Sequence, residues 1–321
     1  MSDSNHTESA HSWDTYWKGT GAVGAFSAGG VAHPDIAAFW HDFFTSVASR
    51  NESIQLLDIA TGNGALLEMA LSILDDELTA YTCVDISEAA IQNIGQRFPG
   101  VVGVIANALS IPLDDKRFNL VTSQFGVEYA GMDAIGESAR LVASGGQLVL
   151  MLHIADGVVY KECQASLEAI EKLQAANFTP LATAFFDAGF AAVRGADRQA
   201  YDAAGTLLSP AIRVAEDIMT EYGEGVAGDT IARLYSDVGR IHSNLPKYDP
   251  DEVLGWLDSM EKELQAYAGR MSSMMGAAIT KAAFSDLCGQ LASSGFSLDR
   301  SEPLLTTGQA IPLAWVLVAR R

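Results

Sequence analysis

The sequence contains few cysteines. Only three of its 321 residues are cysteine, and Cys83, Cys163 and Cys288 are odd in number and far apart. No two of them stand at the spacing of a disulfide framework, a redox pair or a metal-binding pair. We therefore expect no disulfide and no metal site, and we interpret each thiol as a small buried apolar side chain.

Basic residues are also scarce. The chain has 20 Lys and Arg against 40 Asp and Glu, which gives a formal net charge of -20. Nucleic-acid affinity depends on basic groups that neutralise phosphates, and the sequence contains no basic cluster. The charge balance therefore argues against a nucleic-acid partner and is typical of a feature that promotes solubility or salt tolerance.

Long apolar runs are absent as well. No window reaches the roughly 18 apolar residues that a bilayer span needs, and the opening residues MSDSNHTESAHSWD are polar and acidic, unlike a signal peptide. We expect a globular, cytoplasmic protein without membrane contact. Its 49% hydrophobic content is enough to bury one large domain or two ordinary ones.

Short apolar runs alternate with amphipathic segments in the first half of the chain. The candidate strands are residues 54–60, 78–84, 101–105, 119–124 and 147–154, and helical periods fill segments such as 66–74 and 87–98. Helices that alternate with apolar strands indicate a parallel sheet covered on both faces. We therefore predict a doubly wound, Rossmann-like α/β domain.

The pattern changes after residue 155. Helical periods dominate residues 156–277, and the α/β pattern then resumes with a helix closed by Gly295 and two last strands. We expect three parts: an N-terminal cap segment and helix (1–50), an α/β domain (51–155 and 278–321), and a helical insertion (156–277). The insertion is predicted to be either a lid over a substrate or a homodimer interface.

The stretch LLDIATGNGAL, residues 56–66, places Gly62 and Gly64 between a strand and a helix. Glycines there let a ligand approach the backbone closely. Leu67 replaces the third glycine of a dinucleotide-binding turn, and no Lys followed by Ser or Thr is present to cradle phosphates. The turn therefore predicts a ligand that lacks a pyrophosphate.

The next strand ends at Asp85, about 20 residues beyond this turn. Its carboxylate can accept both hydroxyls of a ribose, and Ile86 behind it can lie against an adenine. The alternative is that Asp85 only leads the following helix, beside Ser87. The first interpretation implies a nucleoside without phosphate.

These residues resemble the class I S-adenosylmethionine-dependent methyltransferases. LDIATGNG is similar to their first motif, and the segments NALSIPLDDKRFNLVTSQFGVEYA, ARLVASGGQLVL and LASSGF resemble, in order, later motifs of the ubiquinone/menaquinone-type C-methyltransferases and their relatives. The resemblance covers residues 54–154 and 278–321. It implies a seven-stranded sheet with the last strand antiparallel, and S-adenosylmethionine as cofactor.

The resemblance also assigns cofactor contacts. The first set is Asp58, Ala60, Gly62, Gly64, Asp85 and Ile86; Asn107 and Ala108 would meet the adenine edge, and Gln124 and Phe125 would line the methionine portion. The family more often has Asp where Asn107 stands, but an amide oxygen still accepts from an adenine amino group. Tyr16, Trp17 and Phe26 would cover the cofactor, with aromatic faces toward its sulfonium; simple packing on the sheet is the alternative.

Candidate catalytic residues follow the fourth and fifth strands, where open α/β sheets bind ligands. Methyl transfer is an in-line displacement, and a base is needed only when the acceptor must lose a proton. His153 is the best base, because histidine has an ordinary pKa of about 6.5. Glu128 either acts chemically, bonds the cofactor's amino group or caps a helix, and Tyr129 either assists or packs.

The resulting hypothesis is a methyltransferase that acts on a small-molecule acceptor, at oxygen or nitrogen rather than carbon. A negative surface favours neutral or cationic acceptors over polyanions. An RNA-modifying enzyme of the same fold, a nicotinamide-dependent oxidoreductase and a non-catalytic cofactor-binding subunit are the rivals. The charge counts against the first, and Leu67 counts against the second.

Overall fold

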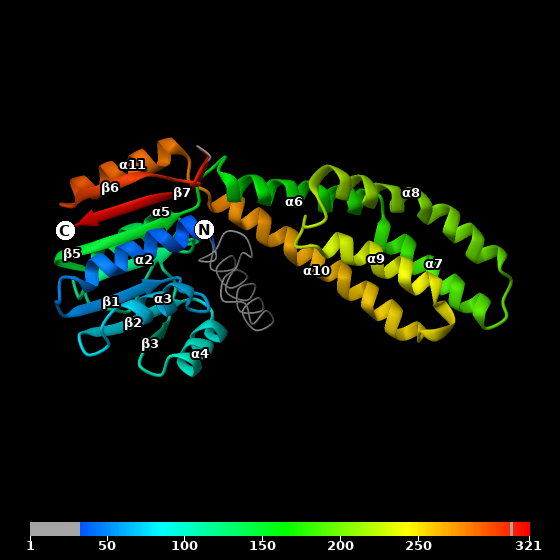
Figure 1. The fold of residues 1–321 in the computed structure, drawn as a ribbon, viewed down its shortest axis with the longest axis horizontal. Coiled ribbons are helices and arrows are strands. Elements are labelled where there is room, and N and C mark those ends of the chain that lie inside the picture. The colour runs from blue at the N-terminus through cyan, green and yellow to red at the C-terminus, as the bar shows by residue number, and fades with distance from the viewer. Residues whose placement is uncertain (1–32, 309–310) are drawn as a thin grey trace. The chain divides into compact units, whose positions relative to one another are not determined.

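The computed structural model describes residues 33–308 and 311–321, and the chain divides into two compact units (Figure 1). The α/β unit contains the described residues up to Tyr160 and from Gly276 onward, and the helical unit is Lys161–Met275. Most of the expected N-terminal cap segment lies outside the described residues.

The α/β unit is built on a seven-stranded sheet in the order β3-β2-β1-β4-β5-β7-β6. The strands are β1 (Ile54–Ile59), β2 (Thr79–Asp85), β3 (Val102–Ile105), β4 (Phe118–Gln124), β5 (Val142–Leu152), β6 (Ser297–Leu305) and β7 (Pro312–Arg320). β1 to β5 pair in parallel, whereas β7 is antiparallel to β5 and β6. The predicted fold class, with its antiparallel last strand, is confirmed.

Helices complete the α/β unit because its central strands are apolar on both faces. They are α2 (Pro34–Ala48), α3 (Ala65–Ile73), α4 (Glu88–Arg97), the 3-10 helix η1 (Val127–Ala130), α5 (Met132–Leu141) and α11 (Lys281–Ser293). α5 and α11 share one core with the sheet, where the rings of Phe284 and Trp315 stack with centroids 4.3 Å apart. α2 and α3 pack against each other.

The start of β5 differs from the sequence prediction. We expected a turn at Gly145 and Gly146 and a strand from Gln147, but β5 begins at Val142. The Gly145 N–H donates to the carbonyl of Arg321, and the Arg321 N–H donates to the carbonyl of Gly146. These bonds keep the two glycines paired within the sheet, and the pairing with β4 shifts register there.

The helical unit consists of five helices and a short 3-10 turn: α6 (Val158–Ala175), α7 (Phe178–Val193), α8 (Gln199–Tyr222), α9 (Thr230–Ser243), η2 (Leu245–Lys247) and α10 (Pro250–Ala277). It has its own core, in which Phe178, Phe186 and Leu257 are fully buried. None of the described helices combines the length and apolar character that a bilayer crossing requires.

The connections to the helical unit meet at the carboxyl end of β5. Ile154 and Ile279 form a short parallel bridge. The Ala155 N–H donates to the Ile279 carbonyl at 3.1 Å, and the Ile279 N–H donates to the His153 carbonyl at 2.8 Å. The outgoing and returning segments are therefore hydrogen-bonded to each other beside His153.

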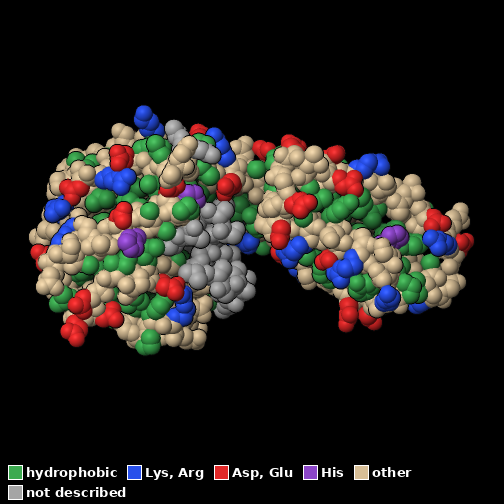
Figure 2. Space-filling model, viewed as in Figure 1, with side chains coloured by type: hydrophobic (Ala, Val, Ile, Leu, Met, Phe, Trp, Pro, Cys, Tyr) green, Lys and Arg blue, Asp and Glu red, His purple; other side chains and the backbone are tan. Residues whose placement is uncertain are grey.

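The order of the strands reverses at the β1–β4 pair: β2 and β3 follow on one side of it, and β5 follows on the other. This pair is therefore the switch point of the sheet. In open α/β sheets, ligands bind at the carboxyl ends of the strands at this point. The loops that follow β1 and β4 are therefore expected to form the ligand-binding site. In Figure 2, acidic and basic side chains are interspersed over the visible face, and the described residues form no basic patch on it.

Candidate active site

The turn after β1 has the conformation that its glycines suggest. Gly62 and Gly64 have φ of 54° and 83°, in the left-handed region that favours glycine, and Gly64 is the N-cap of α3. Ala60 shares this conformation, with φ of 54°, which is strained for a residue with a Cβ. Leu67 belongs to α3 and is fully buried. An apolar side chain therefore occupies the position where a dinucleotide-binding turn has glycine, which lets helix and strand pack closely.

Asp85 ends β2 and holds this turn in place. Its Oδ2 accepts from the Gly62 N–H at 2.8 Å, and its Oδ1 accepts from the Ser87 N–H at 2.9 Å. Burial raises the pKa of Asp85, and the backbone N–H groups of Ser87 and Gly62 oppose that shift. The Ile86 N–H is a third backbone donor to this carboxylate. Of the roughly four lone pairs of the carboxylate, about one remains for a ribose hydroxyl. The helix-leading role and a ribose-binding role are therefore compatible.

Asp58 lies beneath the same turn, paired with Cys83 on β2 and Thr122 on β4. Burial raises the pKa of Asp58 to about 7, although Thr122 donates its hydroxyl to Oδ1 at 2.9 Å. Burial and the charges of Asp58 and Asp85 raise the pKa of the Cys83 thiol to about 12. This part of the interior therefore holds two carboxyl groups whose ionisation is disfavoured by burial.

The turn after β4 meets the turn after β1. A Cβ on Gly126 would lie 2.6 Å from the Cβ of Ala60, so only glycine fits at this contact. The preceding Phe125 has φ of 50°, a second strained residue at the switch point. The amide oxygen of Gln124 is buried without a hydrogen-bond partner. Strain and unsatisfied polar atoms concentrate at functional sites, and both occur here.

Glu128 and His153 form a buried pair. Glu128 Oε1 accepts from the His153 backbone N–H at 2.9 Å and contacts His153 Nδ1 at 2.8 Å. The two residues are only 4% exposed. Because a carboxylate can only accept, the imidazole donates from Nδ1, and in its neutral form it then keeps the lone pair on Nε2. This arrangement fixes both the tautomer and the position of the ring.

Two aromatic rings border the imidazole of His153. The centroid of Phe125 lies 4.5 Å from it in a tilted arrangement, and that of Tyr129 lies 5.6 Å from it, edge to face. Both rings are half-buried. The structure therefore brings together all three residues that were expected to be catalytic.

The loop after β3 carries the two residues expected near adenine. Asn107 Oδ1 accepts from the Leu109 N–H at 2.9 Å, so one of its lone pairs is engaged in the loop itself. Ala108 is buried, and Ile86 is half-buried at the end of β2. Tyr16, Trp17 and Phe26 lie outside the described residues.

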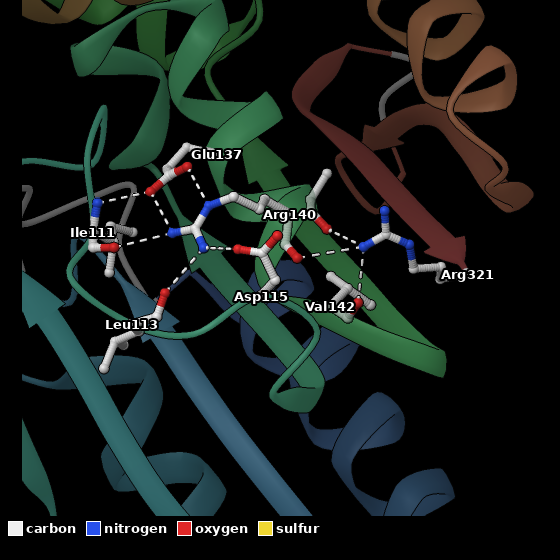
Figure 3. Close-up of polar contacts among 8 residues, drawn as sticks. Ile111, Leu113, Asp115, Glu137, Arg140, Val142 and Arg321 are labelled. Atoms are coloured by element: carbon white, nitrogen blue, oxygen red, sulfur yellow. Dashed lines mark hydrogen bonds and ion pairs between the residues drawn. The ribbon is translucent and has the colours of Figure 1, made fainter.

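Arg140 anchors this loop from α5 (Figure 3). It donates to the carbonyls of Ile111 and Leu113 at 3.0 Å each and pairs with Glu137 and Asp115. Hydrogen bonds from Arg140 lower the pKa of Glu137, and those to Glu137 and Asp115 raise the pKa of the guanidinium. The Arg140 side chain thus secures the segment that follows Asn107 and Ala108.

Sequence reasoning missed two contributors. Ser123 donates its hydroxyl to the Ile59 carbonyl at 2.7 Å and accepts from the Val127 N–H, so it joins the ends of β1 and β4. Its place beside a predicted strand end was the available signal. Ile279, which bonds the His153 carbonyl, gave no signal because its role depends on the return of the chain after 125 intervening residues.

The described residues fit a nucleoside with a cationic amino-acid tail. Asp85 is placed for ribose hydroxyls, the Gly62–Gly64 turn admits a close ligand, and buried oxygens of Gln124 and Glu128 lack partners. No group of three or more His, Cys, Asp or Glu among the residues in view is arranged to hold a metal. The donor set suits an organic cofactor.

Comparisons with known proteins agree with this fit. Residues 57–150 match a family described as methyltransferase domain. An uncharacterised methyltransferase of Schizosaccharomyces pombe is 27% identical over 141 residues, which is 43% of this chain and 55% of that protein. The ubiquinone/menaquinone biosynthesis C-methyltransferase UbiE of Shewanella halifaxensis is 30% identical over 125 residues, covering 36% and 49%. The chain spans about half the length of these curated relatives.

Among solved structures, the geranyl diphosphate C-methyltransferase from Streptomyces coelicolor A3(2) aligns at 16% identity with a TM-score of 0.36, over 48% of this chain and 66% of that one. The family match covers the segment that holds the glycine turn, Asp85 and Glu128. Residues 57–150 therefore match a methyltransferase domain, and S-adenosylmethionine is the cofactor that this similarity supports.

Proposed function

We propose that the chain transfers a methyl group to an oxygen or nitrogen atom of a small molecule. The observation that carries this proposal is the buried Glu128–His153 pair at the carboxyl ends of β4 and β5, with Oε1 to Nδ1 at 2.8 Å. A carbon acceptor with no proton to lose at the outset needs no such base, whereas a hydroxyl or a protonated amine does.

Bound S-adenosylmethionine supplies the methyl group as a reactive sulfonium. The Gly62–Gly64 turn and Asp85 would bind its nucleoside, and Gln124 and Phe125 would line its methionine portion. His153 Nε2 accepts the proton of the acceptor, and Glu128 stabilises the imidazolium that forms. Most of the acceleration then comes from alignment of donor and acceptor.

A substitution of His153 tests the proposal. His153→Ala is expected to lower turnover about 100-fold or more, the usual contribution of a positioned base, and to leave affinity for S-adenosylhomocysteine unchanged. The measurement is label transfer from methyl-labelled cofactor into a metabolite extract, with mass spectrometry of the product and calorimetry for binding.

The matched control is His41→Ala, because His41 lies exposed on α2. Unchanged turnover in His153→Ala would remove His153 from the mechanism. Label that appeared in RNA and in no metabolite would favour the RNA-modifying alternative. Tight cofactor binding without any label would favour the non-catalytic subunit.

A further inference from the structure

Buried charge in the α/β unit is unbalanced. The buried acids of the described residues are Asp58, Asp85 and Glu128, and no described Lys or Arg is buried. All three acids belong to β1, β2 and the turn after β4, around the switch point. A buried carboxylate without a cation is costly, so this region favours ligands that bring positive charge.

Two oxygens at this place lack hydrogen-bond donors. Gln124 Oε1 and Glu128 Oε2 are buried without partners, and the side chain of Glu128 is 1% exposed. An unsatisfied buried acceptor is costly, and a ligand that donates a hydrogen bond to it removes that cost. A hydroxyl group can donate one hydrogen, whereas an ammonium group can donate up to three. Two open acceptors only four residues apart, at the end of β4 and in η1, therefore match an ammonium better than a hydroxyl.

The aromatic rings beside His153 favour the same ligand. Phe125 and Tyr129 border the imidazole at 4.5 and 5.6 Å and are both half-buried. Aromatic faces attract cations through the quadrupole of the ring. The strained φ of 50° at Phe125 indicates that its ring is held there at a cost in backbone energy.

Proton transfer to His153 also costs less from an ammonium. Deprotonation of a hydroxyl creates an anion and an imidazolium from two neutral groups, and the anion forms among buried carboxylates. Deprotonation of an ammonium only moves a positive charge from the ligand to the imidazole. In a site of low dielectric, moving a charge is cheaper than separating two.

Given the proposed methyl transfer, we propose that the acceptor is an amine bound as its ammonium ion by Gln124 Oε1 and Glu128 Oε2. An ammonium N–H bond breaks and His153 Nε2 takes the proton. The nitrogen lone pair, presented after rotation about the C–N bond, attacks the methyl carbon. The C–S bond breaks with its electron pair on sulfur, which leaves an N-methylammonium product and a thioether.

The amino group of the cofactor is also an ammonium. The experiment must therefore distinguish binding of an acceptor amine from binding of the cofactor's own amino group. The chain is saturated with S-adenosylhomocysteine, and phenethylamine and 2-phenylethanol are titrated by calorimetry at pH 7.5. These probes differ only in the ammonium and hydroxyl groups. We expect the amine to bind at least 10-fold more tightly than the alcohol.

Variants locate that preference. Glu128→Gln and Gln124→Met are each expected to reduce this preference below threefold. Affinity for S-adenosylhomocysteine should stay within twofold in Glu128→Gln, whereas Gln124→Met is judged on the ratio of the two probes alone, because Gln124 also lines the proposed methionine site. Two variants are used so that the proposal can still be tested if one of them fails to fold. The control is Glu77→Gln, the same change at an exposed site, which should keep the preference.

The other outcomes overturn the inference in different ways. Equal affinity of the two probes, or no binding of the amine, excludes an amine acceptor and leaves methylation of a hydroxyl possible. A loss of more than 10-fold in S-adenosylhomocysteine affinity in both variants assigns the two oxygens to the cofactor's own amine. Failure of the unaltered chain to bind S-adenosylhomocysteine removes the proposed function together with this inference.

Discussion

At the scale of single residues, Asp85 combines an observed structural role with the proposed ribose contact, and a substitution would affect both. Its carboxylate holds the Gly62 and Ser87 N–H groups and is placed for a ribose. We expect Asp85→Ala to weaken S-adenosylhomocysteine binding by about 3 kcal/mol, or roughly 100-fold, because hydrogen bonds to a charged group are lost. Calorimetry measures this affinity, and Asp286→Ala is the control because the Asp286 side chain is exposed on α11. A loss below threefold would contradict the ribose assignment.

Asp58 gives the stability of the protein a pH dependence of unusual sign. Its pKa is about 7 in the folded protein against 3.8 for the free group, so the folded state holds the proton more tightly. Stability from this group is greatest below pH 3.8 and is lost as the pH rises toward 7, by at most about 4 kcal/mol. Asp58 therefore destabilises the fold at neutral pH.

The substitution Asp58→Asn should remove this penalty. We expect the variant to be more stable than the parent at pH 8 by about 1–3 kcal/mol, and the difference to shrink at pH 5. Urea unfolding of the ligand-free chain at both pH values measures it. Thr122→Val, which removes the hydroxyl donor, should act in the opposite direction at pH 8. Equal stabilities at both pH values would show that Asp58 titrates normally.

At the scale of helices and strands, the loop after β3 depends on one side chain of α5. Arg140 secures it through two carbonyls and two carboxylates. We expect Arg140→Ala to lower the free energy of unfolding by about 2 kcal/mol and to weaken cofactor binding through the displaced loop. Arg240→Ala is the control, because Arg240 pairs on an exposed surface, and it should cost less than about 1 kcal/mol.

Most strands and the turn at Gly62 and Gly64 were predictable because their signals are local. β1 was predicted at residues 54–60 and observed at Ile54–Ile59, since a fully buried parallel strand forms a continuous apolar run. The glycines and Asp85 stood out by spacing. Within the helical insertion, α8 continues through Pro210, which sequence rules treat as a helix breaker. Its N-terminal half packs against α7, and this tertiary contact compensates for the proline.

The pairing of Glu128 with His153 could not be derived from sequence. The two residues are 25 positions apart, and each was identified only as following a strand. Their contact depends on the register of β4 against β5, where Gln124 pairs with Met151. Register is set by the whole sheet and not by local pattern, which is why the residues were predicted but their hydrogen bond was not.

At the scale of the whole molecule, the helical unit should be separable from the sheet. Each unit has its own core, and the connecting segments bond each other at Ile154 and Ile279. Paired strands lie about 4.8 Å apart, so a linker of roughly four residues can replace residues 158–277. We expect this deletion variant to unfold cooperatively and to bind S-adenosylhomocysteine within about threefold of the parent.

Circular dichroism and calorimetry check that expectation. The comparison is the same deletion with Ile279→Pro, which removes the N–H that bonds the His153 carbonyl. That second variant should be less stable. Loss of cooperative unfolding in the first variant would mean that the sheet needs the helical unit to fold.

The position of β7 determines the order in which the sheet can form during synthesis. β7 lies between β5 and β6 and pairs with both. Until residues 312–320 have been made, β5 pairs only with β4 and β6 has no partner in the sheet. A nascent chain that has emerged as far as Leu305 has an apolar β5 with an open hydrogen-bonding edge. Such edges recruit strands from other chains, so the unfinished protein needs protection from aggregation until β7 emerges.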